Sequence, residues 1–331
     1  MLVSKTPLRV SFLGGGSDYE SYFRQYRGAV FGMTINSFVY TSLLELNDIS
    51  KENYRFTYRK TESVLSPSEI EHPVVREVLT SMMISEKLNI ATMSNVPGGT
   101  GLGSSSAFTV GLINLINGFQ RQHLDPGELA ELAIKIERTV LKEPGGLQDQ
   151  IFAAYGGVNV IEFSADKYSV RKLTIREDVI GEISEHFALI PVAEVRSSSE
   201  FAAKTEQNLK NNLKFRNNMS DDIDFLLKET SGDRSFDTCG ELFEFISRCL
   251  NRSWETKKII YSPSELRLFE EVENRVIGLG ASAFKICGAG ASGFLFAAFP
   301  QKIQSDVNFR AEHPEWIFPK IEVKGSTLSE I

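Results

Sequence analysis

The sequence predicts an α+β protein with two domains, and three observations carry that prediction. Segments in which apolar and polar residues alternate, as in strands, are mixed with segments of helical periodicity along all 331 residues. A chain of this length suits two modest domains or one large domain. From about residue 185 long charged helices replace the strand-rich pattern, so we predict one domain over residues 1–185 and another over 186–331.

The first half of the chain is expected to begin with strands. The predicted elements in order are strands at 8–14, 37–46 and 53–60, a helix at 72–83, a strand at 88–96 and a helix from about 105 to 121. A further helix is expected over 125–141, where Asp125 can cap, Pro126 suits the first position and Glu128 completes a capping box. "EPGGLQDQ" (143–150) ends this helix with a proline and two glycines, and strands follow at 156–163 and 168–175.

The second half is expected to carry longer helices. We predict a strand at 186–195, several charged helices through about residue 280, a strand, glycine turn and strand over 283–299, and a final strand at 316–323.

Composition excludes several classes of function. The net charge of −7 lacks the broad basic face of a nucleic-acid binder, although local donors can still bind a small anion. The three cysteines form no CxxC pair, and no histidine spacing is typical of a zinc site. The first ten residues lack the apolar core of a signal peptide, and no apolar stretch is long enough to span a bilayer. We therefore predict a soluble cytoplasmic protein with neither nucleic-acid nor membrane partners.

The stretch "PGGTGLGSSSAFTVGL" (97–112) predicts a phosphate-binding loop. Glycines let backbone amides approach an anion, and the start of the following helix adds unpaired amides and a positive dipole end. No lysine follows the last glycine, so the loop is not a Walker A motif. A flexible turn with an ordinary serine cap is the alternative. The predicted nucleotide contacts are Gly98, Gly99, Gly101, Leu102, Gly103, Ser104, Ser105 and Ser106.

Glu137 occupies an unusual place on the helix expected over 125–141. At 3.6 residues per turn, it lies beside an apolar face, whereas Glu131, Lys135 and Arg138 lie opposite. The residues of that apolar face are Leu129, Leu132, Ala133, Ile136 and Val140. A carboxylate at a buried edge needs a cation as partner, either a metal ion or the side chain of an arginine or lysine.

"GAGASG" (288–293) matches the GxGxxG fingerprint of dinucleotide-binding proteins. That fingerprint requires a helix directly after it. Here an apolar segment with the pattern of a strand follows, and too little chain remains for a βαβ unit. We therefore reject an NAD site and interpret the glycines as close backbone packing beside an active site.

Three segments in order resemble the galactokinase, homoserine kinase, mevalonate kinase and phosphomevalonate kinase (GHMP) superfamily. They are "TPLRVSFLGGGSDY" (6–19), "PGGTGLGSSSA" (97–107) and "KICGAGASGF" (285–294). Within it, "QDQIFAAYGGVNVIEF" (148–163) and "VRSSSEF" (195–201) are similar to the sugar-kinase group that contains the D-glycero-D-manno-heptose 7-phosphate kinases. The resemblance implies an N-terminal domain like ribosomal protein S5 domain 2, a ferredoxin-like C-terminal domain, and an active site between them.

The resemblance also implies roles for single residues. Asp149 corresponds to the catalytic base, Arg9 to a basic residue near the transferred phosphate, and Glu137 to a Mg²⁺ ligand. Ser105 is the expected second Mg²⁺ ligand, with the register left open between Ser104 and Ser106. The remaining expected substrate contacts are Asp18, Gly15, Gly16, Arg196 and Gly290.

Some of these roles have alternatives. Asp18 could instead cap a helix, and Asp149 could make a simple turn. Arg196 and Lys204 are alternative contacts for an anion, or else surface charges. The bare "GGL" at 145–147 leaves open whether the substrate carries a phosphate.

These features predict a transferase that uses ATP and Mg²⁺ to phosphorylate a sugar or sugar phosphate. D-glycero-D-manno-heptose 7-phosphate, at its anomeric hydroxyl, is the first candidate. A kinase for another sugar, such as fucose or galactose, and a ligand-sensing relative without catalysis are the alternatives. The sequence leaves the choice between a monomer and a homodimer open.

Overall fold

The computed structural model describes residues 1–165, 167–192, 198–232, 234–288 and 293–331. Within these residues the larger sheet has eight strands, in the order β13-β1-β2-β5-β3-β4, with β6 and β7 added at the other end of β2. Its strands are β1 (Leu2–Leu13), β2 (Gly28–Glu45), β3 (Tyr54–Thr57), β4 (Thr61–Val64), β5 (Leu88–Ser94), β6 (Val158–Ser164), β7 (Lys167–Lys172) and β13 (Thr327–Glu330).

Two smaller sheets complete the strands of the described chain. One joins β11 (Ala283–Ile286), β12 (Gly293–Ala298) and β9 (Phe187–Val192), and the other pairs β8 (Thr174–Ile175) with β10 (Ser235–Phe236). The helices are α1 (Glu20–Phe23), α2 (Pro73–Ser81), α3 (Ser104–Phe119), α4 (Pro126–Ile134), α5 (Gln148–Tyr155), α6 (Glu177–Ser184), α7 (Ser198–Asn211), α8 (Leu213–Glu229), α9 (Cys239–Lys258), α10 (Pro263–Gly278) and α11 (Val307–Glu312), with a 3₁₀ turn at Pro67–Glu69 and a π-helix at Lys135–Val140. The mixed α+β architecture confirms the predicted fold class.

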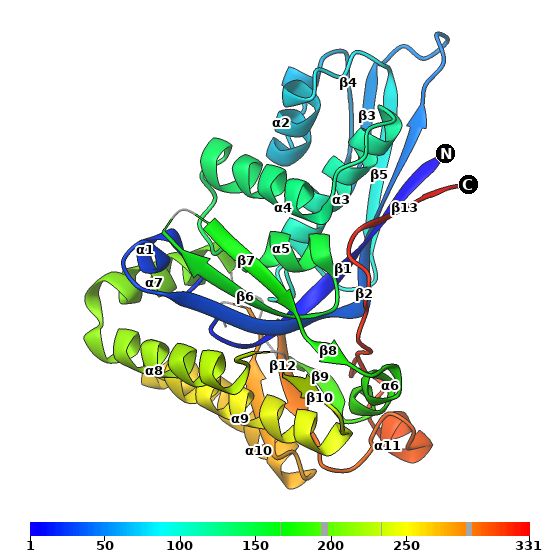
Figure 1. Cartoon of the computed structure of the whole chain (residues 1–331). Helices are drawn as coiled ribbons and strands as arrows, with labels where there is room; N and C mark the ends of the chain where they lie inside the picture. Colours follow the sequence, from blue (N-terminus) through cyan, green and yellow to red (C-terminus); the bar gives the residue numbers. More distant parts are fainter. Residues whose placement is uncertain (166, 193–197, 233, 289–292) are drawn as a thin grey trace.

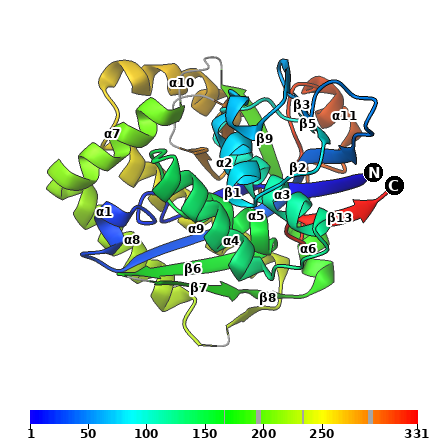
Figure 2. The same cartoon turned by 90° about the horizontal axis from the view of Figure 1, so that it is seen from above.

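The long strand β2 joins two parts of the larger sheet. Its first residues pair with β6 and its last residues with β5, while β1 runs antiparallel beside it for most of its length. Helices α3 and α5 contact β1 and β2 from one side, and α8 and α9 contact them from the other. Figures 1 and 2 show these strands between the two groups of helices.

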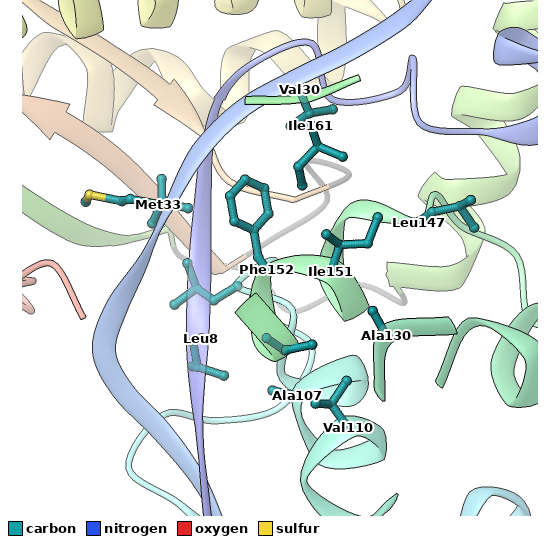
Figure 3. Packing of buried hydrophobic residues seen from close by; sticks show 14 of the residues in the cluster. Leu8, Val30, Met33, Ala107, Val110, Ala130, Leu147, Ile151, Phe152 and Ile161 are labelled. Atoms are coloured by element: carbon teal, nitrogen blue, oxygen red, sulfur yellow. The ribbon is translucent and has the colours of Figure 1, made fainter. Parts of the chain in front are cut away.

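Coverage from both sides buries both faces of β1. Its last eight residues are all buried, and the polar Thr6, Arg9 and Ser11 are among them. Figure 3 shows Leu8 of this strand, Phe152 of α5 and Ala107 of α3 in the same cluster of apolar side chains. The start of α5 is thereby held against the strand that carries Arg9.

The smaller three-stranded sheet forms the second part of the molecule. Helix α9 contacts β11, and α10 contacts β9. A separate apolar cluster, which includes Trp254 and Leu295, fills the space between these helices and the sheet. The chain then returns to the larger sheet, where β13 pairs with β1 (Figure 1). The division at residue 185 remains a prediction.

Several predicted elements differ from the structure. Strand β2 begins at Gly28, nine residues earlier than the sequence pattern indicates. Residues 316–323 form only isolated bridges at Ile317 and Ile321, because Pro319 between them has no amide to donate. The segment 143–150 was expected only to end a helix, but its last residues form the start of α5. Asp149 therefore lies in the first turn of a helix.

Candidate active site

A cavity of about 440 Å³ brings together residues that are far apart in the sequence. Its lining includes the glycine turn at 14–16, the loop at 99–106, the end of the π-helix, the start of α5, and parts of α8 and α9. Arg9, Asp18, Glu137 and Asp149, each predicted to act in the site, all line it. The side chains predicted to act on substrate, metal and proton therefore share one cleft.

The glycine loop presents bare backbone at the start of α3. Gly99, Gly101 and Gly103 have φ of 79°, 78° and 76°, in the left-handed region that favours glycine. Gly103 is the N-cap residue, with no side-chain cap, so the ordinary serine cap is not what begins this helix. The first amides of α3 have no intrahelical acceptors, which is the arrangement that binds anions at helix N-termini.

Two of the predicted nucleotide contacts lie outside the cavity lining. Leu102 is fully buried, and its carbonyl accepts a hydrogen bond of 3.0 Å from the amide of Arg9. Gly98 does not line the cavity, and a side chain added there would meet open space. Leu102 therefore links the loop to β1, and the neighbouring loop residues line the cavity.

Asp149 and Arg9 form an ion pair beside this loop. Arg9 Nε and Nη2 lie 2.7 and 2.6 Å from Asp149 Oδ1, and Arg9 Nη1 donates to the Gly101 carbonyl at 2.6 Å. Both contacts go to one oxygen of the carboxylate, so the second oxygen, Oδ2, is available for another partner. Gly103 packs against both side chains, because a Cβ there would lie 3.3 Å from Arg9 and 3.4 Å from Asp149.

Glu137 is buried at the rear of the phosphate loop, with 1% exposure. Its Oε2 accepts from Ser106 Oγ at 2.9 Å and from Gln150 Nε2, and Arg138 Nη2 lies 3.4 Å away. Its Oε1 has no hydrogen-bond partner among the described residues. Ser106, and not the exposed Ser105, is the serine that contacts Glu137.

A π-helix positions Glu137, where the sequence predicted a continuous α-helix. The capping box at Asp125 and Glu128 is present as predicted, but the α-helical hydrogen bonding ends at Ile134. One wide turn shifts every later residue around the axis. Val140, expected on the apolar face, is 47% exposed, and Arg138, expected on the opposite face, reaches the cavity and donates to the Gly146 carbonyl.

Asp18 is buried at the other end of the cleft. Its side chain accepts from the amides of Gly16 and Gln148 and from Gln148 Nε2, at 2.9 to 3.1 Å. Desolvation raises the pKa of its carboxyl, and the two backbone hydrogen bonds oppose that rise. It is not a helix cap, because Tyr19 is the N-cap residue of α1. Gly146 has to be glycine, since a Cβ would overlap Asp18.

Two predicted substrate contacts, Arg196 and Gly290, lie outside the described residues. Lys204, the other candidate for an anion contact, forms an ion pair of 2.6 Å with Glu265 and is not part of the cavity lining. Sequence reasoning missed Gln148 and Gln150, which flank Asp149 on α5, and the cavity-lining lysines Lys257 and Lys285. The glutamines could have been found from their position around Asp149, and Lys285 from its place at the start of the 285–294 motif. Nothing near Lys257 in the sequence indicates the cleft.

Comparison with known proteins gives matches over part and over all of the chain. The family model of the GHMP kinase N-terminal domain matches residues 72–157. A D-glycero-alpha-D-manno-heptose 7-phosphate kinase of Campylobacter jejuni is 29% identical over 308 residues, which cover 88% of each chain. The crystal structure of a D-glycero-D-manno-heptose 1-phosphate kinase from Bacteroides thetaiotaomicron superimposes with a TM-score of 0.72 at 25% identity, over 100% of this chain and 99% of that one.

Residues 72–157 match the GHMP kinase N-terminal domain, and the chain is similar to kinases of this superfamily over nearly its full length, as the motifs predicted. The protein is an ATP-dependent small-molecule kinase. A mevalonate kinase from Methanococcus jannaschii has the same fold, with a TM-score of 0.67 at 18% identity, over 99% of this chain and 96% of that one. No helix in the described part of this kinase has the length and apolar character needed to cross a membrane.

Proposed function

We propose that this kinase transfers the γ-phosphoryl group of ATP to the anomeric hydroxyl of D-glycero-D-manno-heptose 7-phosphate. The Asp149–Arg9 pair beside the amides of the phosphate loop carries the proposal for the reaction. The similarity to a heptose 7-phosphate kinase over 88% of both chains supports the substrate.

Asp149 is the proposed general base. Its Oδ2, left without an Arg9 contact, accepts the proton of the attacking hydroxyl, while Arg9 holds Oδ1 and fixes the orientation of the carboxylate. The glycine loop binds the phosphates of ATP through its amides. Arg9 also bonds the carbonyl of Gly101, so the base and the phosphate cradle are held in a fixed relation.

Glu137 and Ser106 are the residues that would hold Mg²⁺. The unpartnered Oε1 of a buried carboxylate fits this ion, which takes oxygen ligands and is usually held by one or two carboxylates together with substrate phosphates. Bound there, Mg²⁺ would neutralise charge on the ATP phosphates. Gln150 donates to Oε2 and keeps Glu137 oriented toward the loop. Ser105, the serine first expected in this role, is replaced by Ser106 in the proposal.

Asp18 is the proposed ligand of the sugar. Its oxygens already accept three hydrogen bonds from the 14–16 turn and Gln148, which hold the carboxylate rigidly beside the cavity. The remaining lone pairs can accept from a sugar hydroxyl. Gly15 and Gly16 line the same part of the cleft and leave room for a ring.

Steady-state ADP release tests the proposal with a panel of heptose 7-phosphate, the phosphate-free heptose, fucose and galactose. We expect the highest kcat/KM with heptose 7-phosphate. Asp149→Asn should lower kcat about 10²- to 10⁴-fold, the usual contribution of a general base, with little change in the KM for ATP. Asp224→Asn, at an exposed position on α8, is the matched control.

Two results would overturn parts of this proposal. Near wild-type kcat in Asp149→Asn would remove the base assignment. Tight sugar binding by the wild-type protein without turnover of any sugar would instead favour a ligand-sensing protein without catalysis.

A kinase for a phosphate-free sugar is the second candidate. A bifunctional fucokinase/GDP-fucose pyrophosphorylase of Arabidopsis thaliana is 26% identical to this chain, over 87% of this chain and 29% of the length of that protein.

A further inference from the structure

Two lysines from distant segments line the same part of the cleft. Lys257 lies near the end of α9, and Lys285 lies on β11 with 3% exposure. Both belong to the cavity lining, together with Ser11 and Ser253. Neither lysine takes part in the proposed phosphoryl transfer.

Each lysine has a hydrogen-bond donor left over. An ammonium group has three donors. Lys257 Nζ donates to the carbonyls of Ile286, at 3.2 Å, and Gly288. Lys285 Nζ donates to the carbonyl of Ser11 at 2.8 Å and to Ser253 Oγ at 3.1 Å. All four acceptors are neutral, so each ammonium can take one more acceptor within the described structure.

The positive charge of this pair is not compensated. Among the described residues neither lysine has a carboxylate within 4.0 Å, and the charge of Arg9 is already matched by Asp149. Asp222, which also lines the cavity, is engaged by Arg252 and Thr256. Burial lowers the pKa of Lys285 to about 8 and lowers that of Lys257 well below its usual range. Burial thus disfavours the charged form of both lysines, and an anion bound beside them would restore it.

The surroundings of Lys285 point to an anion on the acceptor instead of on ATP. The phosphates of ATP already have the amides of the glycine loop and of α3. Lys285 is anchored to Ser11, whose hydroxyl lies 3.6 Å from the place of a Cβ on Gly15, in the turn expected to meet the sugar. A phosphate monoester brings about two negative charges near neutral pH, which matches two ammonium groups.

We propose that Lys257 and Lys285 bind the phosphate group of the sugar-phosphate acceptor and so select it over the phosphate-free sugar. This inference rests on the proposed function, because it assigns a substrate group to the same cleft. It also answers the question that the bare 145–147 segment raised, since the phosphate contact comes from the other half of the chain. Lys257 and Lys285 are thus specificity-determining residues, and the proton transfer stays with Asp149.

Calorimetric titration with inorganic phosphate tests the site without any need for turnover. The full chain is first saturated with Mg²⁺ and a non-hydrolysable ATP analogue, so that phosphate cannot enter the nucleotide position. Wild-type protein should bind phosphate. Lys257→Met and Lys285→Met should each weaken this binding about 10- to 100-fold, the usual loss for a hydrogen bond to a charged group. Lys258→Met, next in sequence but paired with Glu255, should change nothing.

Kinetics supply the second readout. The KM for heptose 7-phosphate should rise by a similar factor in both variants, whereas kcat/KM for the phosphate-free heptose and the KM for ATP stay unchanged. If a Met variant does not fold, Lys285→Gln is compared with the wild type instead. The proposal is overturned if the wild type binds no phosphate beside the analogue, or if the variants weaken the analogue instead. Phosphate binding that follows these lysines without heptose turnover would contradict only the proposed function.

Discussion

Glu137 combines near-complete burial with an oxygen that accepts no hydrogen bond from any described residue. A buried carboxylate without full hydrogen bonding costs free energy, and such a cost persists where the group serves a ligand. Asp149 follows the same pattern in milder form, since Arg9 engages only one of its two oxygens. Single side chains in this cleft are therefore held by one atom and left available at another.

Replacement of Glu137 tests the first of these. Glu137→Gln keeps the size of the side chain but removes the charge that would attract Mg²⁺. We expect kcat to fall at least about tenfold and the Mg²⁺ concentration at half-maximal rate to rise, measured by ADP release over a magnesium titration. Glu131→Gln, exposed on α4, is the control. An unchanged magnesium requirement would exclude Glu137 as the ligand.

Lys285 makes stability depend on pH in an unusual direction. Its folded-state pKa of about 8 lies below the ordinary value of 10.5, mainly because of burial. Between these values the unfolded chain binds more protons than the folded chain, so this residue's contribution to stability rises with pH. The gain should approach about 3 kcal/mol from pH 8 to 10.5.

Urea denaturation of the wild type and Lys285→Met measures this effect by difference. Neighbouring groups that also act on Lys285, namely Cys287, Arg9, Cys249 and Asp222, remain in both proteins. If the free energies of unfolding of the two proteins changed in parallel with pH, the lowered pKa of Lys285 would be contradicted.

The sequence identified the acids of the cleft but not its lysines. Glu137 was conspicuous as a polar residue beside an apolar helix face, and Asp149 was identified by its correspondence to the catalytic base of the superfamily that the motifs resemble. Lys257 lies on a helix rich in charge, where nothing local separates it from Lys258. Only the packing of α9 against β11 brings it to the cavity, and such contacts between distant segments leave no local pattern.

At the scale of elements, the start of α4 was predictable and its end was not. The capping box at Asp125 and Glu128 depends on neighbours three residues apart, which the sequence displays directly. The π-helix at Lys135–Val140 depends on tertiary packing around Glu137, because a wide turn has no advantage by itself. The same holds for the short α5, which is stabilised by apolar contacts with α3 and β1 (Figure 3).

The cap of α4 gives a prediction confined to stability. Asp125→Ala removes the bond to the amide of Glu128 and should lower the free energy of unfolding by about 1 kcal/mol. Asp125→Asn should retain most of it, since asparagine caps equally well. Urea midpoints measure both variants. Activity should stay unchanged, because Asp125 does not line the cleft, and a loss of kcat would show that α4 transmits its end position to Glu137.

At the scale of the whole molecule, the glycine loop at 99–106 packs directly against the C-terminal half of the chain at Gly288 and Gly293. A Cβ on Gly288 would lie 2.3 Å from Gly101 Cα, and one on Gly293 would lie 2.1 Å from the carbonyl oxygen of Thr100. The two halves of the chain therefore meet backbone to backbone beside the glycine loop. The full-length match to solved kinases agrees with one arrangement of both halves.

Gly288→Ala should disturb this contact. The residue has φ of 61°, where alanine costs about 1–2 kcal/mol, and its methyl group would displace Gly101. We expect the dissociation constant of an ATP analogue to rise about tenfold, measured by calorimetry. Gly278→Ala, in open space at the end of α10, is the control and should not weaken binding. Unaltered nucleotide affinity in Gly288→Ala would separate the loop from the C-terminal half.

The wide turn that carries Glu137 amounts to one residue more than an α-helix needs. Deleting a single amino acid at 135 or 136 would let the segment return to regular α-helical winding, which rotates the residues beyond the deletion by about 100°. Such a protein would regain ordinary backbone bonding, while Glu137, the proposed metal ligand, and Arg138 would turn out of register. Loss of one codon would then abolish catalysis in this kinase and leave its fold intact.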